Sequence, residues 1–178
     1  RMQPIKKVFD RFPRVVRDLA RSLNKEIKLI LEGEETDLDK NLVEALADPL
    51  VHLVRNSVDH GIEEPAVRVE NGKPSEGTVI LSASQEGDHI LLTIRDDGAG
   101  MNAEKLKSIA IERGVLDAEA AARMPEKEAF SLIFAPGFST KTEISEVSGR
   151  GVGMDDVKTG INQLNDSIFI DSALGKGT

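Results

Sequence analysis

Residues 48–61, DPLVHLVRNSVDHG, combine a helical repeat of apolar side chains with a cluster of polar ones, and this stretch decides the fold class. At about 100° per residue the apolar positions of this region fall on one side of a helix: Val43, Leu46, Leu50, Leu53, Val54 and Val58. The other side carries His52, Asn56, Asp59 and His60. We therefore expect a helix with one packed face and one ligand-binding face, which ends in a left-handed conformation at Gly61.

The polar face offers groups that suit a metal-bound polyphosphate. The amide oxygen of Asn56 is a hard ligand of the kind that Mg²⁺ prefers. His52 could donate to a phosphate oxygen or act as a base, and Arg55 or His60 could neutralise phosphate charge. An ordinary solvated helix face is the alternative, and these residues alone leave it open.

Strands and further helices surround this helix in an irregular order. Alternating patterns predict strands at residues 26–31 and 167–172 and a hairpin formed by residues 78–84 and 90–95. Helical periodicity predicts a helix over residues 5–24 with a kink at Pro13, and a run capped by Thr36 or Asp37. Further helices are expected at residues 103–113, 127–134 and 154–164. Hairpins without repeated βαβ units predict an α/β (α+β) two-layer sandwich with a mixed, mainly antiparallel sheet packed on helices.

Two glycine-rich segments are candidates for nucleotide contacts. Residues 96–100, DDGAG, follow a strand and place the Asp96 carboxylate where it can accept from an exocyclic amine such as that of adenine. Residues 148–154, SGRGVGM, open a helix, so that successive backbone N–H groups can cradle phosphate; they include Gly149, Arg150, Gly151, Val152, Gly153 and Met154. Each segment alone is also compatible with a simple turn. Neither a Walker A loop nor a dinucleotide G-x-G-x-x-G fingerprint occurs.

Composition narrows the class of protein. The 178 residues fit one domain, 1–178, and their formal charge of −8 disfavours nucleic acid as a partner. The chain has no Cys, and no apolar run approaches the roughly 20 residues of a membrane span. We expect a cytoplasmic domain excised from a longer protein, without direct membrane insertion. Residues 62–77 are expected to be a solvated connection, and residues 135–153 a mobile loop over the site.

Four motifs in one order resemble the Bergerat-type (GHKL) ATP site that histidine kinases, DNA gyrase and MutL share. They are H-x-x-x-N at His52 and Asn56, D-x-G-x-G from Asp96, G-x-G-x-G from Gly149 and G-x-G-T ending at Thr178. Longer segments at residues 1–20, 48–63 and 136–155 are similar to the catalytic domain of CheA-type chemotaxis sensor histidine kinases. This resemblance covers essentially the whole chain.

The resemblance implies a role for individual residues. Asn56 would be the Mg²⁺ ligand, His52 would lie near the γ-phosphate, and the pair would be the catalytic residues. Asp96 would accept from the adenine amine, with Thr178 acting through water. The remaining predicted ATP contacts come from the helix, the DDGAG turn, a later helix and a lid over residues 135–153: Arg55, Asp59, His60, Gly98, Gly100, Lys105, Ser139, Thr140, Gly149, Arg150, Gly151, Val152, Gly153 and Met154.

The implied activity is transfer of the γ-phosphoryl group of ATP, with Mg²⁺, to a histidine on a separate phosphoacceptor domain. None of the three His in this chain lies in an acceptor context, so the isolated domain is expected to bind ATP without its acceptor. Implied partners are the phosphoacceptor and dimerisation domains of the same protein, a CheW-like coupling protein, chemoreceptors and downstream response regulators. The alternatives are a gyrase- or MutL-like ATPase whose nucleotide binding controls assembly, and a regulatory module that binds nucleotide without turnover.

Overall fold

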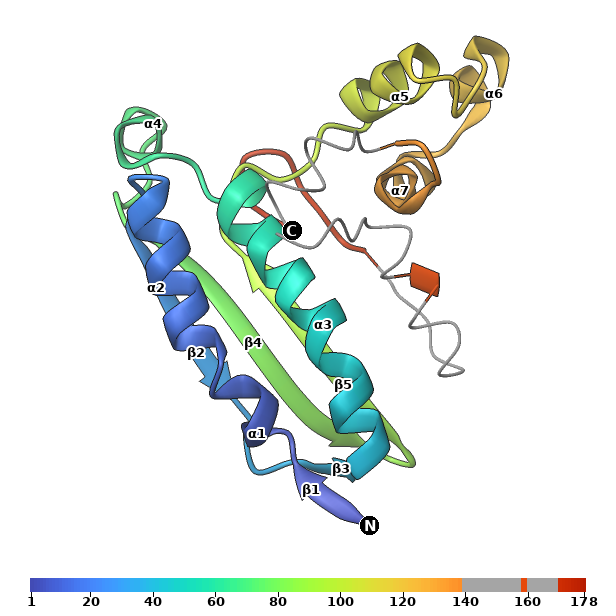
Figure 1. The fold of residues 1–178 in the computed structure, drawn as a ribbon. Coiled ribbons are helices and arrows are strands. Elements are labelled where there is room, and N and C mark those ends of the chain that lie inside the picture. The colour runs from blue at the N-terminus through green and yellow to red at the C-terminus, as the bar shows by residue number, and fades with distance from the viewer. Residues whose placement is uncertain (139–157, 160–169) are drawn as a thin grey trace. The chain divides into compact units, whose positions relative to one another are not determined.

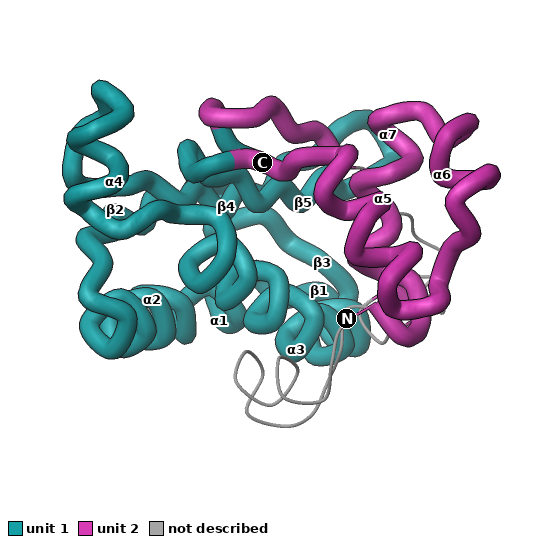
Figure 2. Tube along the Cα trace, turned by 90° about the horizontal axis from the view of Figure 1, so that it is seen from above, with its two compact units in different colours: residues 1–99, 177 teal, residues 100–176, 178 magenta. Residues whose placement is uncertain are grey.

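The computed structural model describes residues 1–138, 158–159 and 170–178. These residues form two compact units, shown in different colours in Figure 2. Unit 1 comprises residues 1–99 and 177, and unit 2 the described part of residues 100–176 together with 178. In the described part of the chain, no helix is both long enough and apolar enough to span a bilayer.

Unit 1 is built on a mixed three-stranded sheet of order β2-β4-β5. The central strand β4 (Gly77–Glu86) pairs in parallel with β2 (Ile27–Glu32) and antiparallel with β5 (His89–Asp96). Alternate residues of β4 are buried, as a half-covered strand requires. A separate antiparallel pair joins β1 (Met2–Pro4) to β3 (Asp37–Asp39). The predicted strand at residues 26–31, the hairpin and the sandwich class are confirmed.

Helices α2 (Phe12–Ser22) and α3 (Lys40–Asn56) lie side by side over one face of this sheet (Figure 1). Between sheet and helices lies an apolar core that includes Phe12, Val16, Leu50, Val54, Val79 and Leu81. The prediction of one helix over residues 5–24 is wrong. A short α1 (Lys6–Phe9) ends before Asp10, and Pro13 lies in the first turn of α2, where its missing N–H costs nothing.

The run predicted to be capped by Thr36 or Asp37 and to end at Ala47, and the helix predicted from residue 48, are one helix, α3, which begins at Lys40. Asp39 is its cap, accepting from the backbone N–H of Asn41 at 2.9 Å. Thr36 and Asp37 are not the cap, because residues 37–39 are already paired in β3. Pro49 lies inside this single helix, which passes directly into a π-helical turn, η1 (Ser57–Gly61), closed by the bond from Ile62 N to Ser57 O. The predicted left-handed end at Gly61 is wrong, because its φ is not positive.

Unit 2 contains α5 (Ala103–Glu112), α6 (Ala118–Arg123), α7 (Glu126–Phe130) and a 3₁₀ turn, η2 (Ser131–Phe134). Its core consists of Ala110, Ala129, Leu132 and Phe138. The helices predicted at residues 103–113 and 127–134 are confirmed, whereas α6 was not predicted. The predicted helix at 154–164, strand at 167–172 and loop at 135–153 fall mostly outside the described residues.

Candidate functional site

Asp96, the last residue of β5, is buried at the point where the strand leaves the sheet. Its Oδ1 accepts from the backbone N–H of Gly98 at 3.0 Å. A Cβ placed on Gly61 would lie 2.9 Å from Oδ2, so the end of η1 abuts the same carboxylate. The carboxylate is therefore held between the DDGAG turn and the end of the α3–η1 helix.

Two glycines allow the backbone to approach this closely. A Cβ on Gly98 would lie 2.0 Å from the carbonyl oxygen of Gly61, and one on Gly177 would lie 1.9 Å from the carbonyl oxygen of Asp96. Gly177 also has a φ of 119°, which side-chain-bearing residues rarely adopt. The turn is further tied to η1 by the bond from Ala99 N to Gly61 O at 2.8 Å. Three segments distant in sequence thus meet at Asp96.

The predicted ligand-binding face of the helix divides into buried and exposed positions. His52 is only 5% exposed, whereas His60 is on the surface. Asn56 ends α3, and Asp59 lies in η1; both are partly buried. His52 is therefore not a solvated side chain, whereas the other three residues of this face keep contact with solvent.

Lys25, between α2 and β2, binds the η1 turn through its side chain. Its Nζ donates to the carbonyl oxygens of Val58 and Asp59, at 2.9 and 2.6 Å. Burial lowers the pKa of Lys25, although the nearby carboxylate of Asp59 raises it. The ammonium satisfies helix-end carbonyls that lack an intrahelical partner.

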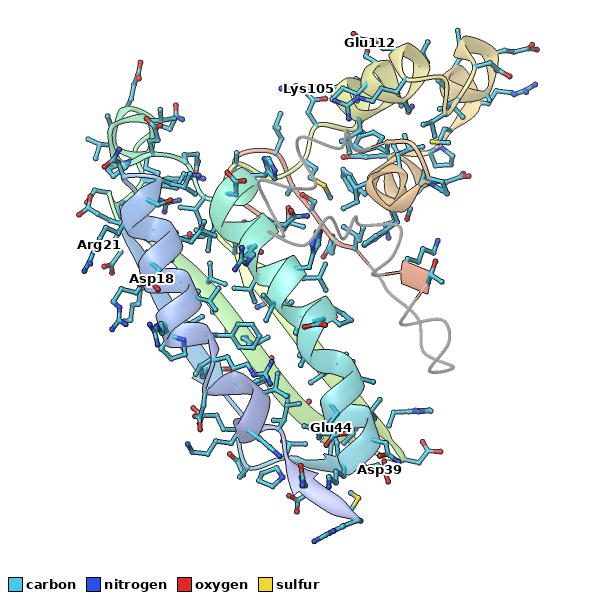
Figure 3. All side chains as sticks on the ribbon, in the orientation of Figure 1. Asp18, Arg21, Asp39, Glu44, Lys105 and Glu112 are labelled. Atoms are coloured by element: carbon cyan, nitrogen blue, oxygen red, sulfur yellow. The ribbon has the colours of Figure 1, made fainter. Side chains whose placement is uncertain are left out.

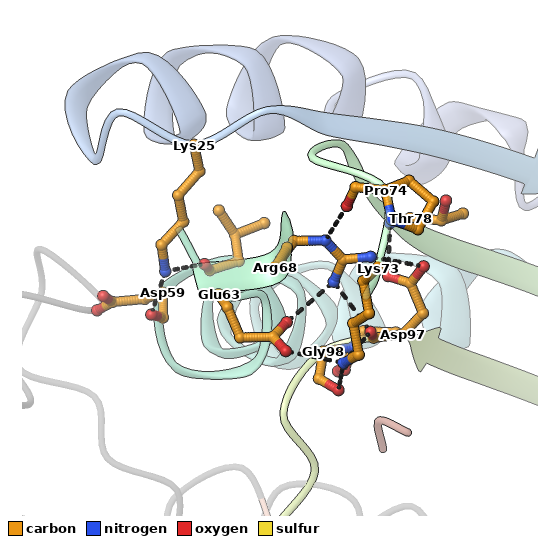
Figure 4. Close-up of polar contacts among 11 residues, drawn as sticks. Lys25, Asp59, Glu63, Arg68, Lys73, Pro74, Thr78, Asp97 and Gly98 are labelled. Atoms are coloured by element: carbon orange, nitrogen blue, oxygen red, sulfur yellow. Dashed lines mark hydrogen bonds and ion pairs between the residues drawn. The ribbon is translucent and has the colours of Figure 1, made fainter. Parts of the chain in front are cut away.

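A network of charged residues, here named the Arg68 cluster, lies behind the DDGAG turn and comprises Glu63, Arg68, Lys73 and Asp97 (Figure 4). Arg68, on α4 (Pro65–Glu70), is 1% exposed. The prediction that residues 62–77 are a solvated connection is therefore wrong for α4 and Arg68, although most residues of this stretch are exposed. No local pattern in residues 62–77 predicted this cluster.

Glu63 bridges the two cations of the cluster. Its Oε1 accepts from Arg68 Nη1 at 2.9 Å, and its Oε2 accepts from Lys73 Nζ at 2.7 Å. Burial raises the pKa of Glu63, but the hydrogen bond and charge of Lys73, a backbone hydrogen bond and the hydrogen bond from Arg68 outweigh burial and leave that pKa lowered. Glu63 is therefore held in its charged form.

Arg55 lies in the last turn of α3. It lines an open groove of about 560 Å³ along α2, together with Asp10, Arg11, Arg14, Val15, Asp18, Leu19 and Ser22. The groove contains both positive and negative side chains. The structure thus places Arg55 against α2.

Other predicted residues lie in unit 2 or outside the described ranges. Gly100 and Thr178 belong to unit 2, where Thr178 Oγ1 lies 2.8 Å from Ser172 Oγ. Lys105 is an exposed residue of α5 (Figure 3). The predicted lid and phosphate-loop residues lie outside the described ranges: Ser139, Thr140, Gly149, Arg150, Gly151, Val152, Gly153 and Met154. Among residues 1–138, 158–159 and 170–178, no three His, Asp or Glu side chains gather as a metal site.

An α/β sandwich with a buried carboxylate at a strand end, enclosed by glycine backbone, is suited to holding a small ligand that carries an amino group. The chain belongs to the family described as histidine kinase-, DNA gyrase B-, and HSP90-like ATPases, which matches residues 45–178. Membership of this family implies ATP binding.

The whole chain is also similar to named chemotaxis proteins. It is 56% identical to chemotaxis protein CheA of Treponema pallidum and 57% identical to sensor histidine kinase CheAY of Helicobacter pylori, covering 100% of this chain and 22% of each relative. It is 48% identical to chemotaxis protein CheA of Bacillus subtilis, over 100% of this chain and 26% of that protein. The chain thus spans about a quarter or less of the length of these relatives.

Proposed function

We propose that residues 1–178 form the ATP-binding catalytic domain of a chemotaxis histidine kinase, which transfers the γ-phosphoryl group of ATP to a histidine on a separate phosphoacceptor domain. The observation that carries the proposal is the buried Asp96 carboxylate between Gly61 and Gly98. The identity to CheA proteins along the full chain supports it.

Asp96 is the proposed acceptor for the exocyclic amine of adenine. A carboxylate has two oxygens with about four lone-pair sites, so one such group can accept from the backbone and from a ligand together; in the structure Oδ1 accepts from Gly98 N. A hydrogen bond to a charged acceptor contributes about 1.5–3 kcal/mol. A base without that amine would not make this hydrogen bond to the buried carboxylate, which is the physical basis for selecting adenine.

Asn56 is the proposed Mg²⁺ ligand, since it offers a neutral amide oxygen at the end of α3. Mg²⁺, when bound, would neutralise phosphate charge and orient the transferred group. His52, Asp59 and His60 would complete the helix side of the site, whereas Arg55, which lines the groove along α2, is assigned to ATP by the resemblance alone. Lys105, Thr178, Gly100 and the lid residues are assigned to phosphate and base contacts by the resemblance alone.

The partners and the compartment are also part of the proposal. The γ-phosphoryl acceptor would be a histidine domain of the same protein, beside a dimerisation domain. A CheW-like coupling protein and chemoreceptors would control it, and response regulators would receive the phosphoryl group. The names of the relatives support a chemotaxis role for this domain, and a cytoplasmic location is proposed with it.

A calorimetric titration with ATP, with and without Mg²⁺, tests the site. We expect Asp96→Asn to weaken ATP binding about 10- to 100-fold, because the amide replaces a charged acceptor by a neutral group. Asn56→Ala should remove the Mg²⁺ dependence. The control is Asp88→Asn, an exposed carboxylate of the β4–β5 turn, which should bind as the wild type does. Wild-type affinity in Asp96→Asn would contradict the assignment.

Addition of a phosphoacceptor domain then distinguishes the kinase from the gyrase- or MutL-like alternative. With Mg²⁺ and ATP, the kinase proposal predicts phosphohistidine on the added domain and little phosphate release without it. Steady ATP hydrolysis by the isolated chain, with no phosphohistidine on an acceptor, would favour the alternative.

A further inference from the structure

We propose that Lys73 and Arg68 are positioning residues for Asp96: they hold the backbone of the DDGAG turn so that the carboxylate selects the base. This inference rests on the proposed function, since it assigns base recognition to Asp96. Neither cation needs to touch the nucleotide. Their contacts reach Asp97 and Gly98, the two residues that follow Asp96.

The side chain of Lys73 binds the main chain of the DDGAG turn. Its Nζ donates to the carbonyl oxygen of Asp97 at 3.1 Å, to that of Gly98 at 2.8 Å and to Glu63 Oε2 at 2.7 Å. A lysine ammonium has three N–H donors, so these acceptors match its full capacity. An arrangement that satisfies every donor of a largely buried ammonium leaves the two carbonyls little freedom to move.

Arg68 holds the same peptide from a second direction. Its Nη1 donates to the Asp97 carbonyl at 3.0 Å and its Nη2 to the Asp97 carboxylate at 3.1 Å, while Nε donates to Pro74 O. The other oxygen of the Asp97 carboxylate accepts from the backbone N–H of Thr78, in β4, at 2.8 Å. The turn is thereby tied to the sheet as well as to the segment that contains α4.

The hold on the turn is transmitted to the ligand-binding group through Gly98. Its N–H donates to Asp96 Oδ1. Its carbonyl oxygen accepts from Lys73 Nζ over a shorter distance than the carbonyl oxygen of Asp97 does. A shift of Gly98 would therefore change the orientation of the Asp96 carboxylate. Apolar packing stabilises as well as a buried ion pair does, but it is not directional. Directed bonds to two successive carbonyls fix the geometry of a turn, which is what base selection requires.

The test compares ATP with inosine triphosphate, which lacks the exocyclic amine, on Lys73→Met and on the control Lys28→Met, an exposed lysine of β2. We expect Lys73→Met to reduce the ratio of ATP affinity to inosine triphosphate affinity about tenfold, and Lys28→Met to preserve it. In an Asp96→Asn background, Lys73→Met should leave the ratio unchanged, because the group that it positions is already absent.

A purely structural role would lower both affinities together and keep their ratio, and that result in Lys73→Met overturns this inference alone. If Asp96→Asn itself keeps the ratio of the wild type, the proposed function fails and this inference fails with it. Circular dichroism establishes that each variant is folded. Should Lys73→Met not fold, Asp97→Asn is measured in its place, since it removes the charged partner of Arg68 while retaining an acceptor for Thr78 N–H.

Discussion

The Arg68 cluster and the outer face of α2 use the same kinds of ion pair in opposite surroundings. In the cluster, the side chains of Arg68 and Glu63 are 1% and 10% exposed. On α2, the i,i+4 pair of Arg14 and Asp18 is 82% and 61% exposed, and Asp18 projects from the helix away from the sheet (Figure 3). Residue type is therefore not what separates the two regions.

Burial decides how much a charged side chain contributes to stability. Water screens the exposed pair, and holding two long side chains in one geometry costs entropy, so such pairs contribute about 0–1 kcal/mol. A buried ion loses its hydration, and removal of its partner leaves a charge with little compensation. The cluster residues are therefore expected to depend strongly on one another, whereas Arg14 and Asp18 are expected to be nearly independent.

The largest expected effect is that of Arg68→Met on stability. The variant leaves Glu63 without one of its two cations and removes four hydrogen bonds, so we expect a loss of about 3–5 kcal/mol in the free energy of unfolding. Urea denaturation followed by circular dichroism measures it. Arg14→Met, the matched change on the exposed face, should cost less than about 0.5 kcal/mol. Equal losses in the two variants would contradict the comparison.

A smaller, pH-dependent effect is expected for Glu63→Gln. Because the folded-state pKa of Glu63 is lowered, its carboxylate contributes stability that is complete above the unfolded-state pKa of about 4.3 and is lost as the pH falls through the folded-state pKa. The difference in unfolding free energy between wild type and Glu63→Gln should be constant between about pH 6 and 7 and shrink below about pH 4. A difference that stays constant down to pH 3 would show that the charge of Glu63 contributes nothing.

The periodic spacing of apolar residues predicted the regular helices and strands, in which buried and exposed positions recur at a fixed interval. The apolar repeat around Leu50 and Val54 predicted α3, and the alternation in residues 78–84 and 90–95 predicted the hairpin, because helix and strand periods appear directly in sequence. The glycines of residues 96–100 predicted a nucleotide contact at this turn, whereas the close backbone approach that Gly98 and Gly177 make around Asp96 was not predicted. Its role in binding stays a prediction.

The features that could not be predicted from the sequence, the Arg68 cluster and the π turn, depend on contacts between distant segments. Arg68 and Lys73 lie in a stretch with two prolines and many charges, which reads the same whether its side chains are solvated or buried against Asp97. The π turn at the end of α3 is likewise stabilised from outside, by Lys25, 33 residues before Val58. No local pattern records such a partner.

The smallest expected effect is the coupling between Arg14 and Asp18, which completes the contrast with the cluster. Their closest atoms, Arg14 Nε and Asp18 Oδ2, lie 3.8 Å apart, and Asp18 also faces Arg17 at 3.9 Å, so no single partner fixes its geometry. A double-mutant cycle with Arg14→Gln and Asp18→Asn should give a coupling of about 0.3–0.5 kcal/mol, from urea denaturation at low salt. At 1 M salt the screening length falls to about 3 Å, so the coupling should vanish. Coupling above about 1 kcal/mol that persists in salt would mean that this exposed face behaves like the Arg68 cluster, and burial would no longer explain the difference.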